Sequence, residues 1–139
     1  MKDLAALVAT IPYLQFLGVH VEERDGRRVA VMPFADHLVG NPTIPALHGG
    51  TLGGLLEAVA HLECLARADH AKLPKTITLT VDFLRSGKPR DTYASAEIVK
   101  QGRRVTTLLC RAWQEDERSP IATATVHLKV SVSDAARTG

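Results

Sequence analysis

The sequence predicts an α+β domain in which a curved antiparallel sheet of about six strands wraps around one long helix. Three observations favour this fold. Residues 50–67 form a helical segment that is apolar almost all round, an Asp25-Gly26 hairpin signal precedes it, and a run of alternating strands follows it. A helix without a polar face must be enclosed, and one curved sheet encloses it with few elements.

The segments before this helix carry local signals of their own. Residues 3–17 have apolar side chains at helical spacing, and Pro12 marks the expected end of a short N-terminal helix. Residues 19–21 and 29–31 alternate like strands on either side of Asp25-Gly26. Residues 35–46 are rich in glycine, asparagine and proline, which is typical of a loop.

Four further strands are predicted after Pro74. Their expected ranges, which polar turns separate, are 77–83, 92–101, 105–113 and 121–132. Residues 1–132 are expected to form a single domain with one core, and residues 133–139 a flexible tail. No internal repeat or low-complexity block divides the chain.

Composition excludes several classes of function. Seventeen Lys and Arg residues against fifteen Asp and Glu residues leave a net charge of +2, and aromatic residues are 4%, so a nucleic-acid partner is not expected. Cys64 and Cys110 lie in apolar segments without paired spacing, as expected of buried, reduced thiols rather than nucleophiles. The sequence shows neither a membrane span nor a signal peptide, so we expect a cytoplasmic protein without a membrane partner.

The chemistry is expected where Leu47-His48-Gly49-Gly50 leads into the apolar helix, in which Glu57 stands out as a carboxylate. Burying an unpaired carboxylate costs free energy, so its presence needs a functional reason. Backbone N–H groups of Gly49 and Gly50 at the helix N-terminus can bind an oxyanion, and Glu57 can attack a carbonyl or activate water. Together these groups can supply a nucleophile or general base and donors for a developing oxyanion.

Gly53 and Gly54 lie three and four residues before Glu57, so they leave the helix surface beside the carboxylate bare. An acyl group can lie there, and two helices that cross closely at a dimer axis would need the same glycines. His48 can cap the loop, hold a carbonyl or orient the acid, and the sequence does not decide among these roles.

His61 lies one turn after Glu57, which favours a hydrogen bond between the two over a metal site, since no third ligand has metal-like spacing. No metal or separate cofactor is therefore expected. The serines lie outside any nucleophile-elbow motif.

The motif of Leu47-His48-Gly49-Gly50 followed by Glu57 resembles that of hot-dog-fold acyl-CoA thioesterases of the phenylacetate-pathway and hydroxybenzoyl-CoA type. Later segments resemble strands of the same family: 81–85, 96–103 and 121–125. The resemblance implies hydrolysis of acyl-CoA thioesters, with coenzyme A as part of the substrate. Glu57, Gly49, Gly50 and His48 are then the catalytic residues. The substrate-binding residues would be Asn41, Gly53, Gly54, His61 and Thr78.

In the relatives that the sequence resembles, the active site lies between two subunits. The resemblance therefore also implies an obligate homodimer, which can pair further into a dimer of dimers. Coenzyme A phosphates need basic groups, for which Arg85, Lys88 and Arg90 are favoured over Arg103 and Arg104. A non-catalytic module that binds or senses acyl-CoA is the alternative, and a hydratase on the same fold is a third hypothesis. The sequence does not identify the acyl group of the substrate.

Overall fold

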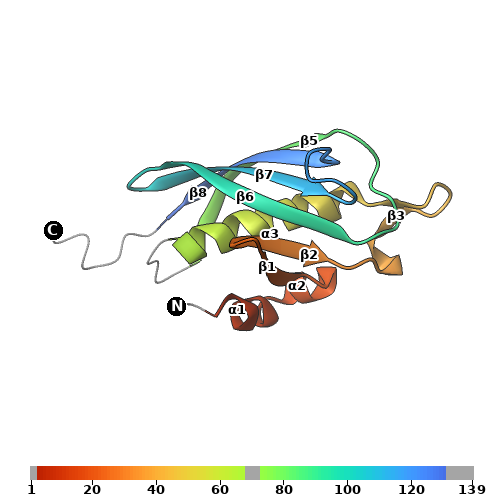
Figure 1. Ribbon diagram of the computed structural model, residues 1–139, viewed down its shortest axis with the longest axis horizontal. Coiled ribbons are helices and arrows are strands. Elements are labelled where there is room, and N and C mark those ends of the chain that lie inside the picture. The colour runs from red at the N-terminus through yellow and green to blue at the C-terminus, as the bar shows by residue number, and fades with distance from the viewer. Residues whose placement is uncertain (1–2, 68–72, 131–139) are drawn as a thin grey trace.

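The computed structural model describes residues 3–67 and 73–130, and in them one curved sheet wraps around one long helix (Figure 1). The sheet has six strands in the order β1-β2-β6-β7-β8-β5, and all neighbours are antiparallel. The predicted hot-dog architecture is therefore confirmed. The helices are α1 (Leu4–Thr10), α2 (Pro12–Leu17) and α3 (Gly49–Arg67). The strands of the sheet are β1 (His20–Arg24), β2 (Arg27–Met32), β5 (Lys75–Phe83), β6 (Thr92–Gln101), β7 (Val105–Trp113) and β8 (Ala122–Lys129).

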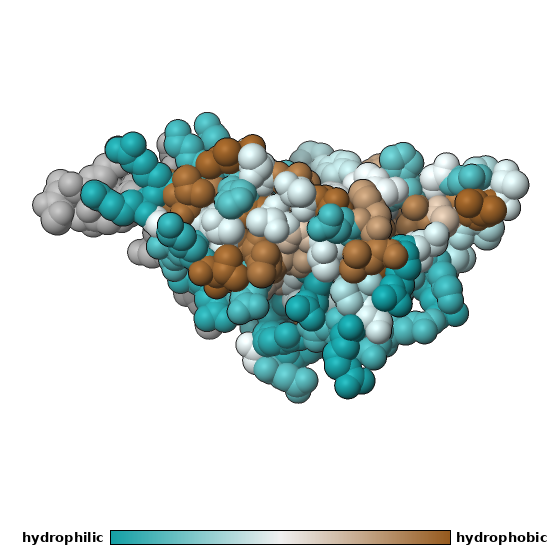
Figure 2. Space-filling view, turned by 90° about the horizontal axis from the view of Figure 1, so that it is seen from above, coloured by the Kyte–Doolittle hydropathy of each residue, from teal (hydrophilic) through white to brown (hydrophobic). Residues whose placement is uncertain are grey.

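The core lies between α3 and the concave face of the sheet, mainly against β6 and β7. Leu55, Leu56, Leu108 and Val126 are fully buried there, as the apolar helix predicts. On the other face of the sheet, apolar patches alternate with polar side chains (Figure 2). The strand side chains that stay exposed although they are large and apolar are Ile77, Phe83, Val99, Val105 and Leu109.

The N-terminal segment forms two helices where the sequence predicts one. α1 ends at Thr10, just before Pro12, as predicted; Pro12 then occupies the first position of a second helix, α2, where its missing N–H removes no hydrogen bond. Asp3 caps α1 by accepting from the N–H of Ala6 at 3.0 Å. α2 then ends at Gly18, whose φ of 75° is left-handed. The chain thus turns twice before it enters the sheet.

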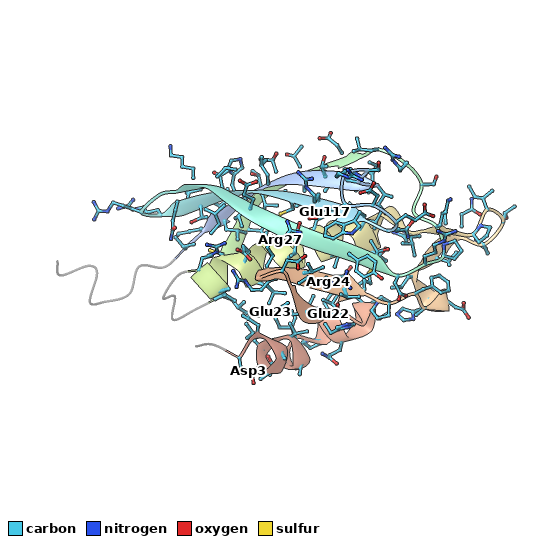
Figure 3. All side chains as sticks on the ribbon, viewed as in Figure 1. Asp3, Glu22, Glu23, Arg24, Arg27 and Glu117 are labelled. Atoms are coloured by element: carbon cyan, nitrogen blue, oxygen red, sulfur yellow. The ribbon has the colours of Figure 1, made fainter. Side chains whose placement is uncertain are left out.

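The hairpin of β1 and β2 turns at Asp25 and Gly26, as predicted, with φ of 52° and 75°. Two positive φ values are the geometry that favours Asp-Gly in a two-residue turn. Charged side chains line this hairpin (Figure 3), and Arg27 reaches across to Glu117 at 2.6 Å. The ion pair links the hairpin to the turn between β7 and β8.

A bulge in β5 changes which side chains face the helix. The register to β8 shifts between Thr76 and Thr78, so strict alternation does not hold there. Leu79 and Val81 pack against the core, which places Thr78 on the opposite face. Thr76 lies on the helix side of the bulge instead, where it meets His61 of α3.

The segment 35–46 has more structure than the expected loop. It holds a 3-10 turn, η1 (Asp36–Leu38), and a small two-stranded sheet of β3 (Val39–Asn41) and β4 (Ala46–Leu47). The N–H of His48 donates to the carbonyl of Leu38 at 2.8 Å. This ladder fixes where the chain enters α3.

α3 carries a second carboxylate, Glu63, which the sequence interpretation passed over. Its residue exposure is only 7%, and it accepts hydrogen bonds from Arg28 at 3.0 and 3.1 Å and from Arg67 at 2.9 Å. These bonds raise the pKa of Arg28. Glu63 therefore ties the hairpin to the helix.

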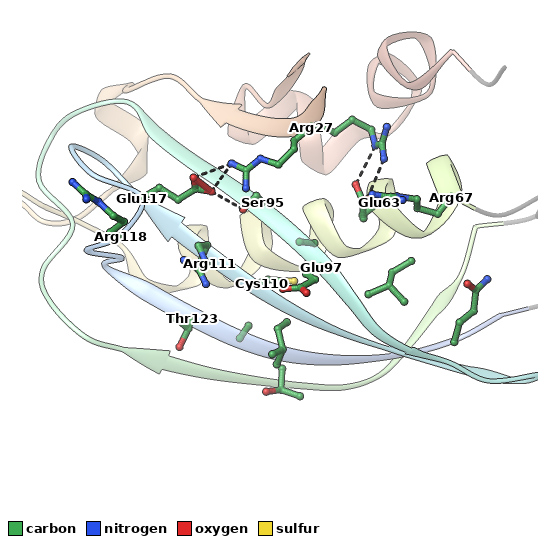
Figure 4. Close-up of a pocket in the computed structure, with 17 residues that line it drawn as sticks. Arg27, Glu63, Arg67, Ser95, Glu97, Cys110, Arg111, Glu117, Arg118 and Thr123 are labelled. Carbon is green, nitrogen blue, oxygen red and sulfur yellow. Dashed lines mark hydrogen bonds and ion pairs between the residues drawn. The ribbon is translucent and has the colours of Figure 1, made fainter. Parts of the chain in front are cut away.

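This ion pair lies in a cleft of about 940 Å³ that opens between β2 and β6 and is also lined by residues of α3, β7 and β8 (Figure 4). The cleft exists because β2 pairs with β6 only over Ala30–Met32, so the rest of the two strands diverges. Its walls carry Arg27, Arg111 and Glu97. Burial raises the pKa of the Cys110 thiol in the cleft to about 12, so that thiol stays protonated and is no nucleophile.

We predict that Arg28→Ala lowers the free energy of unfolding by about 3 kcal/mol, because it leaves a buried carboxylate without its main partner. Arg67→Ala is the matched control: its side chain is 64% exposed, and its loss should cost less than about 1 kcal/mol. Urea unfolding at one protein concentration measures both. Equal losses for the two variants would contradict this division of roles.

Candidate functional site

One face of α3 is left uncovered by the sheet. Gly50, Gly53, Gly54, Glu57 and His61 recur at intervals of three and four residues, so they share this face. All five are exposed or half-buried, whereas most other positions from 51 to 65 are buried. The structure thus brings the predicted catalytic acid and the predicted small residues together on one face.

Glu57 is half-buried, and it forms no hydrogen bond or ion pair with any residue the structure describes. Glu63, six residues later, is held by two guanidinium groups. The two carboxylates of α3 therefore differ in environment. Glu63 is satisfied as a structural ion pair, and Glu57 is available to a substrate.

His48 caps the N-terminus of α3. Its Nδ1 accepts from the N–H of Gly50 at 2.8 Å, and its carbonyl accepts from the N–H and hydroxyl of Thr51 at 2.9 and 2.6 Å. In the neutral ring the proton then lies on Nε2, which remains a donor. A capping role and a substrate-holding role for His48 are thus compatible.

This cap bears on the predicted oxyanion hole. The N–H of Gly50 is engaged by His48, whereas the N–H of Gly49 has no acceptor among residues 3–67 and 73–130. Phe83 of β5 lies against Gly49, since a Cβ there would be 3.3 Å from its ring. Gly49 is therefore the better placed of the two predicted donors. The part of Gly50 in binding an oxyanion stays a prediction.

The loop before His48 is held from two sides. Gly40 of β3 lies so close that a Cβ there would be 2.8 Å from the Cα of His48, which explains the glycine. Leu47 donates to the carbonyl of Gly87 at 2.9 Å, so the loop after β5 lies beside it. Asn41 is exposed and accepts from the N–H of Thr43 at 3.0 Å, a local turn. Its predicted contact with substrate is untested.

His61 closes the far end of the open face. Its Nε2 lies 2.9 Å from Oγ1 of Thr76. Burial lowers the pKa of His61, and the negative charge of Glu57 opposes this only in part, so the ring is neutral at neutral pH. The predicted partner was Glu57, and the structure shows Thr76 in that place. Thr78 is exposed on the opposite face of β5, and its predicted role in substrate binding stays a prediction.

The two neighbouring glycines of α3 have different surroundings. At Gly54 a Cβ would lie 2.8 Å from Cε2 of Tyr13 and 3.2 Å from Cδ1 of Leu17, so α2 packs against this position. At Gly53 nothing lies within 4 Å. Close packing within the chain thus accounts for Gly54. The space at Gly53 is free for a substrate.

Of the two basic clusters, the predicted one lies near the start of α3. Arg85, Lys88 and Arg90 are exposed and belong to the segment around Gly87 that contacts Leu47. Arg90 pairs with Glu115. Arg103 lies at the other end of the sheet, in the turn between β6 and β7. The geometry thus favours the first cluster for a ligand bound at His48.

Other site classes find little support in the described chain. No group of three or more metal-ligating side chains was found in residues 3–67 and 73–130. No helix in that part of the chain is both long and apolar enough to cross a membrane. The cleft between β2 and β6 does not include Glu57 or His48, and its carboxylate Glu63 is already paired, so we regard it as separate from the reaction site.

The sequence matches the family model of the acyl-CoA thioesterase N-terminal domain over residues 40–128, which is more than half of its 139 residues. The chain belongs to the acyl-CoA thioesterase family. The matched part contains His48, Gly49 and Glu57, but neither α1 nor α2. Thioester hydrolysis is the reaction that this family and fold support. The resemblance noted from the sequence is confirmed.

Solved structures agree with this assignment. A protein from Chromobacterium violaceum is 33% identical, with a TM-score of 0.75 over 94% of this chain and 90% of that one. A phenylacetic acid degradation-related protein from Ralstonia eutropha, named as a candidate thioesterase, is 24% identical, with a TM-score of 0.77 over 91% and 96%. A Bacillus halodurans protein solved with CoA is 20% identical, with a TM-score of 0.77 over 92% and 86%. No curated protein matches the chain.

We predict that Gly53→Ala raises the free energy of unfolding by about 1 kcal/mol, because alanine favours a helix and meets no neighbour at that position. The same change should lower turnover if substrate lies on the open face. Gly54→Ala is the matched control. Its methyl group must displace Tyr13, so we expect no increase in the free energy of unfolding. Thermal or urea unfolding beside a thioesterase assay measures both. Unchanged turnover in Gly53→Ala would argue against substrate at that face.

Proposed function

We propose that this protein hydrolyses acyl-CoA thioesters to a free acid and CoA, with Glu57 as the reacting group. The observation that supports this most is that Glu57 is a half-buried carboxylate without a partner in the described chain, on the open glycine face of α3. An acid kept there without a partner is available to attack a carbonyl or to take a proton from water.

Two routes balance the reaction. In the first, a Glu57 oxygen attacks the thioester carbon, the C–S bond breaks, and a mixed anhydride forms while the CoA thiolate takes a proton from water. A second water then cleaves the anhydride to the free acid and the Glu57 carboxylate, and its remaining proton returns to the solvent. In the second, Glu57 takes a proton from the water that attacks, and passes it to the leaving thiolate. Both routes place negative charge on the carbonyl oxygen. The N–H of Gly49 and the Nε2–H of His48 are the proposed donors to it.

The spacing on α3 favours a site shared by two chains. Gly49 and Glu57 are eight residues apart, which is about 12 Å along the helix axis. A carbonyl whose oxygen meets a donor and whose carbon meets the attacking atom spans only roughly 6 Å between the two, since each contact is about 3 Å. A second copy running antiparallel would bring its Glu57 beside Gly49 of the first. We therefore propose that the active unit is a homodimer.

The surface of the single chain supports this assembly. β5 is an edge strand that pairs only with β8, and its unpaired side has backbone groups available to a second copy. Pairing there is isologous and extends the sheet. Val99, Val105 and Leu109 leave further apolar area on the outer face, which fits the predicted dimer of dimers.

For the CoA part of the substrate, we propose that Arg85, Lys88 and Arg90 bind its phosphates. They lie in the segment that contacts the start of α3, and charge-assisted hydrogen bonds from such side chains suit phosphate. The fold relative from Bacillus halodurans was solved with CoA. Arg90 would exchange its pairing with Glu115 for a phosphate.

We predict that Glu57→Gln lowers kcat for acyl-CoA hydrolysis by about 10²–10⁴-fold, because the amide neither attacks nor accepts the proton. Free-thiol release across a panel of acyl-CoA substrates measures this, and Glu97→Gln, at an exposed glutamate of β6, is the matched control. A variant at Glu57 with wild-type kcat would rule out the proposed role. Tight acyl-CoA binding with no turnover by the wild type would instead favour the non-catalytic alternative.

Mixing inactive variants tests the shared site. If Glu57 of one chain serves the His48 and Gly49 of another, then heterodimers of Glu57→Gln with His48→Ala contain one intact site. Equal amounts of the two, unfolded and refolded together, should then recover about a quarter of wild-type activity. A site within one chain predicts no recovery. Heavy oxygen found in Glu57 after single-turnover hydrolysis in labelled water would support the anhydride route, since the general-base route never puts the label there.

A further inference from the structure

Tyr13 of α2 lies directly against the open face of α3. A Cβ at Gly54 would be 2.8 Å from Cε2 and 3.0 Å from Oη of Tyr13, so the ring touches the helix where it has no side chain. Tyr13 lies outside residues 40–128, which the family model matches. This contact is therefore not part of the matched family domain.

The ring contacts α3 about one turn before the proposed reacting group. Gly54 precedes Glu57 by three residues on the same face, which is about 4.5 Å along the axis. Gly53, which is next to Gly54 and four residues before Glu57, has nothing within 4 Å. An acyl group that starts at Glu57 and runs along the open face toward the start of α3 therefore passes beside the ring that lies on Gly54.

Core packing does not explain the aromatic residues of α2. Leu14 and Leu17 supply the buried side of the helix, whereas Tyr13 is 50% and Phe16 is 54% exposed. The two exposed rings stack at 6.2 Å between centroids with 15° between their planes. Large rings kept at the surface beside a reactive carboxylate are available for contact with an apolar ligand.

The rings are also fixed relative to the catalytic loop. His37 of η1 packs edge-on against Phe16 at 4.7 Å, and its Nε2 lies 2.6 Å from the carbonyl of Phe16. The next residue, Leu38, accepts from the N–H of His48. A short path of direct contacts thus joins the aromatic pair to the histidine that caps α3, so both keep one geometry.

We propose that Tyr13 is a specificity-determining residue that contacts the acyl group and limits its length, so that short apolar acyl groups are favoured. The inference rests on the proposed function, since it takes Glu57 as the place where the thioester reacts. The role is steric: the ring blocks the open face one turn before Glu57. A smaller side chain at position 13 opens this path.

The test compares butanoyl-, octanoyl- and dodecanoyl-CoA with the wild type and with Tyr13→Phe, Tyr13→Leu and Tyr13→Ala. We expect Tyr13→Ala to raise the kcat/KM ratio of dodecanoyl- to butanoyl-CoA by about tenfold or more, with Tyr13→Leu between and Tyr13→Phe like the wild type. Val105→Ala, which removes apolar volume at an exposed site on β7, is the control. The graded series keeps the test decisive if Tyr13→Ala fails to fold.

A second readout separates this inference from the proposed reaction. Affinities for the same three thioesters are measured by calorimetry in a Glu57→Gln background, with and without Tyr13→Leu. Glu57-dependent turnover with an unchanged length profile in Tyr13→Leu and Tyr13→Ala overturns the role of Tyr13 and leaves the reaction standing. If Tyr13→Leu shifts the preferred acyl length in binding but the wild type shows no turnover, the role of Tyr13 is supported and the proposed hydrolysis is overturned. Neither binding nor turnover with any thioester overturns both.

Discussion

The site depends on one constraint, which is that a single six-stranded sheet covers only part of the circumference of α3. The helix is apolar enough to be driven into the sheet, and its leucines fill the concave face. The remaining stripe must then be covered by something else or stay open. In this chain glycines, Glu57 and His61 occupy the stripe, and α2 and the end of β5 flank it. The fold itself thus leaves the surface around Glu57 uncovered.

Environment, not residue type, separates the two glutamates of α3. Glu63 and Glu57 have the same chemistry and lie less than two turns apart, but only Glu63 faces the divergent hairpin that supplies Arg28. A buried carboxylate with three hydrogen bonds from guanidinium groups is stable as an ion pair, and its oxygens are not available to a substrate. Glu57 faces away from that hairpin and keeps its oxygens available. The proposed role of Glu57 in hydrolysis therefore depends on the asymmetry of the sheet around the helix.

Local signals predicted most of the fold. The predicted turn at Asp25-Gly26, the predicted strands β5 to β8 and the predicted start of α3 were all correct, because each depends on residues close together in the sequence. The end of the first helix at Pro12 was also correct, but the interpretation missed α2, because proline suits the first turn of a new helix as well as the end of an old one. It also missed the pair of Glu63 with Arg28, since nothing local links residues 35 positions apart. The bulge that directs Thr76 rather than Thr78 to His61 is likewise a product of strand register.

His48 shows how one ring can meet a structural and a chemical need at once. A helix that starts with two glycines is weakly initiated, so the cap from Nδ1 to the Gly50 N–H stabilises its first turn. The same bond fixes the neutral tautomer and leaves the proton on Nε2. It also takes up the Gly50 N–H, so that the Gly49 N–H is the amide left for an oxyanion. A ring protonated on both nitrogens could not accept at Nδ1, and it would lose the cap and the arrangement of donors together. The start of α3 is thus a single unit, in which helix initiation and the proposed binding of negative charge depend on the same proton.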